Sequence, residues 1–163
     1  MKRVAVVMGS DSDMPVVAPA VKKLEELGIP HEVRLISAHR TPETARSFAS
    51  GAADSGIGVI IAAAGKAAHL AGFIAAYTCL PVIGLPVKSS FMDGLDSLLS
   101  IVQMPKGVPV ATVGVDAAEN AAILAAQILA LTNCDLYTKL VQNKLKMSAE
   151  LSEKDGMLTA VRL

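Results

Sequence analysis

The sequence contains few aromatic residues and no excess of either charge. Its 163 residues include no Trp, two Tyr and three Phe, and 15 basic residues balance 15 acidic ones. Because 52% of the residues are hydrophobic, the chain can form a core, which must consist of closely packed Ala, Val, Ile and Leu side chains. Nucleic-acid binding depends on a cluster of Lys and Arg that no segment supplies, so we expect no nucleic-acid partner.

Long hydrophobic runs and cysteines are also scarce. A membrane span needs about 18 uninterrupted apolar residues, and the longest candidate, residues 121–131, is shorter and contains a polar residue. The apolar run near the N-terminus follows two basic residues, as in a signal peptide, but Asp11 and Asp13 end it too early. Cys79 and Cys134 have neither metal-site spacing nor the number for a disulfide scaffold. We therefore expect buried thiols, no metal, no membrane contact and a cytoplasmic location.

Five apolar runs of strand length alternate with helix-like segments. The predicted strands are residues 4–8, 32–36, 59–63, 81–85 and 108–113. The predicted helices are residues 15–27, 42–53, 67–77, 95–102 and 117–131. Such a repeat requires parallel strands with right-handed crossovers. We expect an α/β fold, a three-layer α/β/α sandwich around a five-stranded parallel sheet in the flavodoxin-like order 2-1-3-4-5.

The whole chain, residues 1–163, is predicted to be one domain. Polar residues and a glycine mark the expected ends of its first helices. Asp13 and Thr41 are suited to the N-caps of the first two helices, and Gly28 to the end of the first. From about residue 135 the charge rises, which indicates one more helix and a tail.

The last long predicted helix indicates an oligomer. In residues 117–131, apolar side chains occupy nearly every face, and such a helix must be buried all round. Because a monomer of this size has little room to bury an edge helix fully, we expect a homo-oligomer in which small Ala side chains let helices of neighbouring subunits approach closely.

Two polar segments follow the first two predicted strands and therefore lie at one edge of the sheet, where parallel sheets bind ligands. In the first, Gly9 permits a sharp turn, and Ser10 and Ser12 can bind phosphate or hydroxyl oxygens. Asp13 can accept hydrogen bonds from ribose hydroxyls. The segment has neither the P-loop pattern nor the dinucleotide glycine pattern, and its spacing alone favours an ordinary helix cap.

The second polar segment, residues 37–42, sets His39 beside Arg40. Arg40 can bind a phosphate through two N–H groups, and histidine, whose unperturbed pKa is near neutrality, can act as general acid and base. The pair predicts an anionic small molecule and a proton transfer, and the alternative is a solvated loop with a cap at Thr41. His31 has no such neighbour, and we expect it at the surface.

The segment after the third predicted strand carries almost no side-chain bulk. A flat ligand could lie against its backbone N–H groups, with Gly65 in a turn that a side chain would block. Tight helix packing would require the same small residues. Two interpretations are open for each polar residue of this segment. His69 either lines a pocket or caps the loop. Lys66 reaches either an anion or the solvent. Residues 86–90 add hydroxyls at the same edge or form another cap.

Four segments, residues 9–13, 37–42, 67–70 and 96–105, occur together in one known family. In them the chain closely resembles the bacterial class I PurE family, the N5-carboxyaminoimidazole ribonucleotide (N5-CAIR) mutases of purine biosynthesis. The resemblance implies a flavodoxin-like sandwich, usually assembled as an octamer. It also implies an isomerase that forms 4-carboxyaminoimidazole ribonucleotide (CAIR) through aminoimidazole ribonucleotide (AIR) and trapped CO2, without metal or cofactor.

The resemblance also assigns roles to residues. His39 falls on the family's catalytic histidine, which acts as acid and then removes the C4 proton. The expected substrate-binding residues are Gly9, Ser10, Ser12, Asp13, Ser37, Ala38, Arg40, Gly65, Ala67, His69 and Leu70. Many members have a glycine and a proline where this chain has Lys66 and Ala71. Because a cation close to His39 would make protonation of its imidazole harder, we expect Lys66 to point outward.

Two alternative functions fit the same residues. One is an animal-type AIR carboxylase that takes CO2 from solution, against which residues 67–70 favour the mutase class. The other is a non-catalytic nucleotide-binding module, against which the pairing of His39 with Arg40 argues for chemistry.

Overall fold

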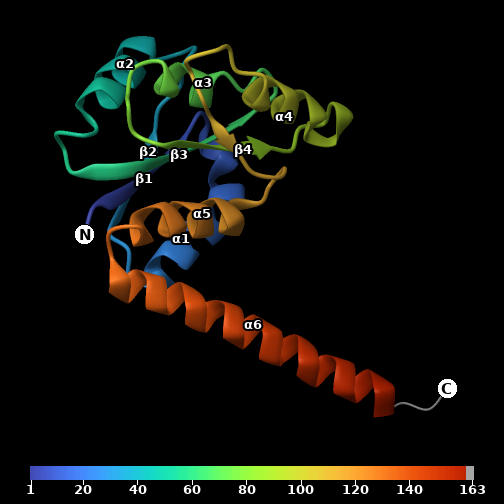
Figure 1. The fold of residues 1–163 in the computed structure, drawn as a ribbon. Helices are drawn as coiled ribbons and strands as arrows, with labels where there is room; N and C mark the ends of the chain where they lie inside the picture. Colours follow the sequence, from blue (N-terminus) through green and yellow to red (C-terminus); the bar gives the residue numbers. More distant parts are fainter. Residues whose placement is uncertain (161–163) are drawn as a thin grey trace.

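The computed structural model describes residues 1–160, and it confirms the predicted sheet. The strands are β1 (Arg3–Met8), β2 (His31–Leu35), β3 (Ile57–Gly65), β4 (Val82–Val87) and β5 (Ala111–Thr112). Neighbouring strands pair in parallel, in the order β2-β1-β3-β4-β5. The sheet forms the middle layer of a sandwich (Figure 1).

Helices cover both faces of this sheet. They are α1 (Met14–Leu27), α2 (Pro42–Gly51), α3 (Leu70–Ala75), α4 (Leu95–Val102), α5 (Ala118–Ala130) and α6 (Cys134–Ala160), with the 3-10 helices η1 (Asp11–Asp13) and η2 (Met92–Gly94). α1 and α5 lie on one face, and α2, α3 and α4 lie on the other (Figure 1). In β1, Val4 and Val6 join the core on the α1 and α5 side, whereas Ala5 and Val7 join the core on the opposite side. This two-sided burial explains why the strand is apolar throughout.

Two elements, β5 and α3, are much shorter than predicted. β5 covers only Ala111–Thr112 of the predicted residues 108–113, because Pro109 has no N–H to donate to the strand ladder. α3 begins at Leu70, three residues later than predicted, because Lys66 adopts a left-handed backbone conformation with φ 55° and directs the chain into a turn first. Both differences shorten an element next to a loop and leave the order of the sheet unchanged.

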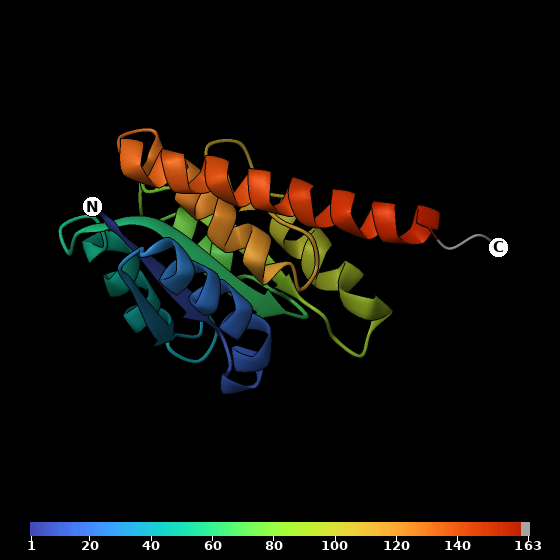
Figure 2. The ribbon, with the colours of Figure 1, turned by 90° about the horizontal axis from the view of Figure 1, so that it is seen from below.

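α5 is only partly covered by its own chain. α1 and α6 share a core with it on this face of the sheet, and α6 crosses it before extending past the body of the molecule (Figure 2). The fully buried residues of α5 are Ala121, Ala122, Ala125 and Ala126. The larger apolar residues Ile123, Leu124 and Ile128 are only half-buried, so a single chain does not bury this helix on every side. Although α6 spans 27 residues, no helix within residues 1–160 is long and apolar enough to cross a membrane.

The environments of the two cysteines differ from the prediction. Cys79 and Cys134 are both exposed, so the expectation of buried thiols is wrong. They lie at the ends of short connections, after α3 and at the first residue of α6, where the chain runs along the surface. His31, expected at the surface, is half-buried there, and its Nδ1 lies 3.1 Å from the carbonyl oxygen of Ile29.

Candidate active site

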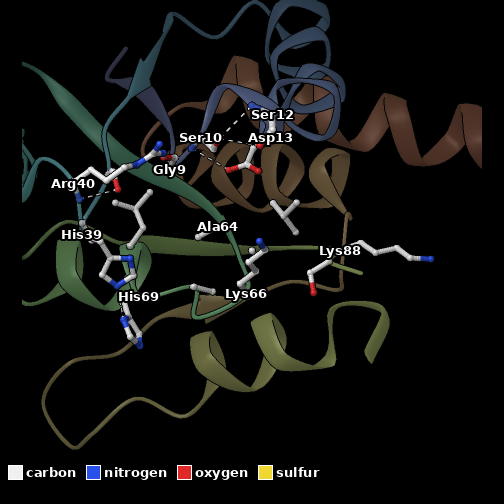
Figure 3. A pocket seen from close by; sticks show the side chains of 17 residues that line it. Gly9, Ser10, Ser12, Asp13, His39, Arg40, Ala64, Lys66, His69 and Lys88 are labelled. Carbon is white, nitrogen blue, oxygen red and sulfur yellow. Dashed lines mark hydrogen bonds between the residues drawn. The ribbon is translucent and has the colours of Figure 1, made fainter. Parts of the chain in front are cut away.

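The segments that follow β1, β2, β3 and β4 enclose a cavity of about 420 Å³ (Figure 3). Its lining residues are Gly9, Ser10, Ser12, Asp13, Ser37, Ala38, His39, Arg40, Ala64, Gly65, Lys66, Ala68, His69, Leu70, Val87, Lys88 and Ser89. Of the residues predicted for the site, only Ala67 is not among them. Sequence reasoning missed Ala64 and Ala68, because a methyl side chain carries no chemical signal.

The loop after β1 is organised by Ser10 and Asp13. The backbone N–H of Ser10 donates to Asp13 Oδ2 at 3.2 Å, and the Ser10 hydroxyl accepts from the backbone N–H of Ser12 at 3.4 Å. The two residues form a capping box around η1. The side-chain cap is therefore Ser10, three residues before the predicted one, and the Asp13 side chain makes no capping hydrogen bond to α1.

The Asp13 carboxyl is nearly buried at the bottom of this loop. Burial raises its pKa above the ordinary value of 3.8, while the hydrogen bond from the Ser10 backbone and the positive charge of Arg40 oppose the rise. Keeping the Asp13 carboxylate ionised in the cavity therefore costs folding stability. A ligand hydroxyl that donates to Asp13 would reduce this cost.

We expect Asp13→Asn to raise the melting temperature at pH 7 and to change it little at pH 3. The folded state binds the Asp13 proton more tightly than the unfolded state does, so stability falls as the pH rises from 3.8 through the folded pKa. Asn removes the charge but keeps an oxygen that accepts from Ser10. Calorimetry of both proteins between pH 3 and pH 8 measures the difference. Asp11→Asn, in the exposed part of the loop, is the control, and a difference independent of pH would contradict the prediction.

The loop after β2 brings His39 against His69 and Arg40 against Gly9. His39 Nε2 lies 2.7 Å from His69 Nδ1, and the two rings meet edge to face at 78°, so one imidazole donates a hydrogen bond to the other. The Arg40 guanidinium donates to the carbonyl oxygen of Gly9, which ties this loop to the one after β1. The sequence placed these residues at one sheet edge, but it gave no indication of the contact between the two histidines.

Ser37 and Thr41 fix the shape of the same loop. The Thr41 hydroxyl accepts from the Ser37 backbone N–H and donates to the Ser37 carbonyl, both at 3.0 Å. The Ser37 hydroxyl accepts from the Arg40 backbone N–H at 3.2 Å. Thr41 therefore precedes α2 as predicted, but its side chain does not cap the helix. Held in this way, the loop directs His39 and Arg40 along the wall of the cavity (Figure 3).

The turn after β3 places Lys66 over the cavity. Ala68 donates its backbone N–H to the Gly65 carbonyl at 3.1 Å, and within this turn Lys66 has a left-handed backbone conformation. A Cβ on Gly65 would lie 3.3 Å from the Val87 carbonyl oxygen, so the glycine allows β3 and β4 to approach closely. The Lys66 side chain lines the cavity and extends over it (Figure 3). The expectation that it points away from the site is therefore wrong.

The loop after β4 closes the last side of the cavity. Lys88 donates its backbone N–H to Asp116 Oδ1 at 2.8 Å, and its Nζ lies 3.0 Å from Asp93. Its side chain extends away from the other labelled residues (Figure 3). The Ser89 hydroxyl donates to Asp96 Oδ2 at 3.1 Å. The polar groups of this loop thus mainly bond to the protein itself.

The charges around the cavity favour an anionic ligand. Arg40, Lys66 and Lys88 are cationic, and Asp13 is the one carboxylate among the lining residues that the structure describes. Within residues 1–160, no group of three His, Cys, Asp or Glu side chains is arranged to hold a metal ion. The arrangement can bind an anion and transfer a proton through an imidazole.

Known proteins are similar to this chain in sequence and in fold. Residues 3–150 match the AIR carboxylase family. The chain is 54% identical over 161 residues to an N5-carboxyaminoimidazole ribonucleotide mutase of Thermotoga maritima, covering 99% of this chain and 94% of that one. It is 55% identical over 151 residues to the mutase of Pyrococcus horikoshii, covering 93% and 85%. Its fold is similar to the crystal structure of Treponema denticola PurE, with a TM-score of 0.87, 29% identity and coverage of 95% and 97%.

Proposed function

Because the chain belongs to the AIR carboxylase family, we propose that it is an N5-CAIR mutase, an isomerase of purine biosynthesis that converts N5-CAIR to CAIR. The observation that carries this proposal is the His39–His69 pair, 2.7 Å apart, in a cavity that Arg40 and Asp13 also line. Mutases more than half identical to the chain support the same reaction.

Two loops bind the ribonucleotide, the loop after β2 through Arg40 and the loop after β1 through Asp13. Arg40 binds the phosphate with the N–H groups that it does not donate to Gly9. Asp13 accepts from the ribose hydroxyls, and Ser10 and Ser12 lie beside it. The imidazole ring of the substrate then lies toward His39 and the small residues of the turn after β3.

His39 donates one proton in the first step and accepts one in the last. As the bond between N5 and the carboxylate carbon breaks, His39 protonates N5, which gives AIR and CO2. The electron pair of C4 then attacks the carbon of CO2 and forms the new C–C bond. His39 removes the C4 proton, which restores the aromatic ring and returns the imidazole to its starting state. The hydrogen bond with His69 holds the His39 ring in one orientation through both transfers.

Two substrates distinguish the mutase from a carboxylase that takes CO2 from solution. CAIR formation is followed from N5-CAIR and from AIR, each with and without added bicarbonate. The proposal expects rapid conversion of N5-CAIR without bicarbonate, and conversion of AIR only when bicarbonate is abundant. If AIR with bicarbonate is the better substrate, the carboxylase assignment replaces the mutase. If neither is converted, the binding-module alternative is favoured.

We also propose that the chain forms a homo-oligomer, with eight subunits by resemblance to its family. Support comes from α6, which extends beyond the body of the molecule (Figure 2) and carries a series of exposed apolar side chains: Tyr137, Val141, Leu145, Met147 and Leu151. Light scattering of the purified protein is expected to give the mass of eight 16.9 kDa chains. A mass of one chain across the micromolar range would contradict the proposal.

A further inference from the structure

We propose that Lys66 is a substrate-binding residue that holds the carboxylate group as it moves from N5 to C4. This inference rests on the proposed mutase function and adds a specific contact to it. Lys66 lines the cavity together with His39 and Arg40, and its side chain extends over the cavity from the turn after β3 (Figure 3).

Lys66 is the cation of the cavity that is most available to a ligand. Lys88 is paired with Asp93 at 3.0 Å, and Arg40 already donates to the Gly9 carbonyl. Within residues 1–160, Lys66 makes no salt bridge. An ammonium group that lines a cavity without a partner in the protein is free to pair with an anion of the ligand.

The substrate carries two separate anions, a phosphate and a carboxylate. The planar guanidinium of Arg40 suits the phosphate, which it can bind through two N–H groups. The carboxylate moves between two neighbouring positions on the imidazole, so a fixed planar donor would suit only one of them. The ammonium of Lys66 is a compact charge on a flexible stem, and it can remain in contact with the carboxylate at both positions.

The backbone of Lys66 supplies a second observation. Its φ of 55° lies in the left-handed region, which glycine adopts without strain and a residue with a Cβ does not. Strained residues of this kind occur preferentially at functional sites. A lysine is thus present where the local conformation favours glycine, in a turn that faces the cavity, and its side chain offers a reason for the strain.

Calorimetric titration with two related ligands tests the proposal. CAIR carries the carboxylate, whereas AIR has the same phosphoribosyl group without it. In Lys66→Met, the affinity for CAIR is expected to fall by about tenfold to a hundredfold, the range for a hydrogen bond to a charged group. The affinity for AIR is expected to remain within about twofold of the wild type, and Lys66→Arg is expected to keep most of the CAIR affinity.

A glycine variant separates folding from binding. Lys66→Gly removes the backbone strain, so its melting temperature is expected to equal or exceed that of the wild type, while its loss of CAIR affinity matches that of Lys66→Met. Equal losses for CAIR and AIR would assign Lys66 to the phosphate, and no loss for either would make it a solvated side chain. Either result would contradict the proposed role of Lys66 and leave the proposed mutase function intact. If the wild type binds neither ligand, the proposed function fails, and the inference fails with it.

Discussion

Replacing His39 with Asn is expected to lower kcat by about 10²–10⁴-fold, the contribution typical of general acid–base catalysis. Asn is similar in size and polarity, but its amide neither gains nor loses a proton near neutral pH and so cannot act as an acid or a base. Because Arg40 and Asp13 remain in place, the affinity for AIR is expected to stay near the wild-type value. Steady-state kinetics with N5-CAIR and calorimetry with AIR measure the two quantities on the same preparation.

The contact between His39 and His69 adds a second test of this prediction, which the sequence alone did not suggest. His69 lies in the same cavity, 2.7 Å from His39, so a second imidazole is available to carry the proton in the variant. If it does, the residual rate of His39→Asn will fall further when His69→Asn is added. His31→Asn, at a histidine that does not line the cavity, is the matched control and should keep full turnover. A His39→Asn variant with more than about a tenth of the wild-type kcat would remove His39 from the proton transfers.

The fold could be predicted because its signals are local and repeated. Apolar runs of strand length alternating with amphipathic segments leave few topologies for a parallel sheet. The carboxyl ends of the strands then identify the loops that form the site, which is how His39, Arg40 and Asp13 were placed together. Gly28 also ends α1 as predicted, with φ 69°.

The features that could not be predicted from the sequence depend on contacts between segments far apart in the chain. The path of α6 decides whether α5 is covered, and nothing in residues 117–131 encodes that path. The direction of Lys66 depends on the turn that follows β3, and the pairing of His39 with His69 depends on two loops thirty positions apart. The exposure of Cys79 likewise reflects where a short connection runs along the surface.

Replacing Arg40 with Lys is expected to weaken ribonucleotide binding by about 1–3 kcal/mol, the usual range for hydrogen bonds to charged groups. The guanidinium has enough N–H groups to donate to the Gly9 carbonyl and to a phosphate at the same time. An ammonium keeps the charge but cannot reproduce two parallel hydrogen bonds to the phosphate while also holding the loop after β1. In Arg40→Lys, the affinity for the ribonucleotide is therefore expected to fall more than kcat.

The phosphate is identified by comparing AIR with its nucleoside, which lacks that group. In Arg40→Lys, calorimetry is expected to show the loss for AIR but little change for the nucleoside, because only the nucleotide contacts the missing donors. Arg46→Lys is the matched control, since Arg46 lies on α2 outside the cavity and pairs with Glu43 at 2.9 Å. Unchanged affinity of Arg40→Lys for AIR would mean that the phosphate lies elsewhere. A similar loss for both ligands would mean that Arg40 acts by holding Gly9 and the loop after β1 in place.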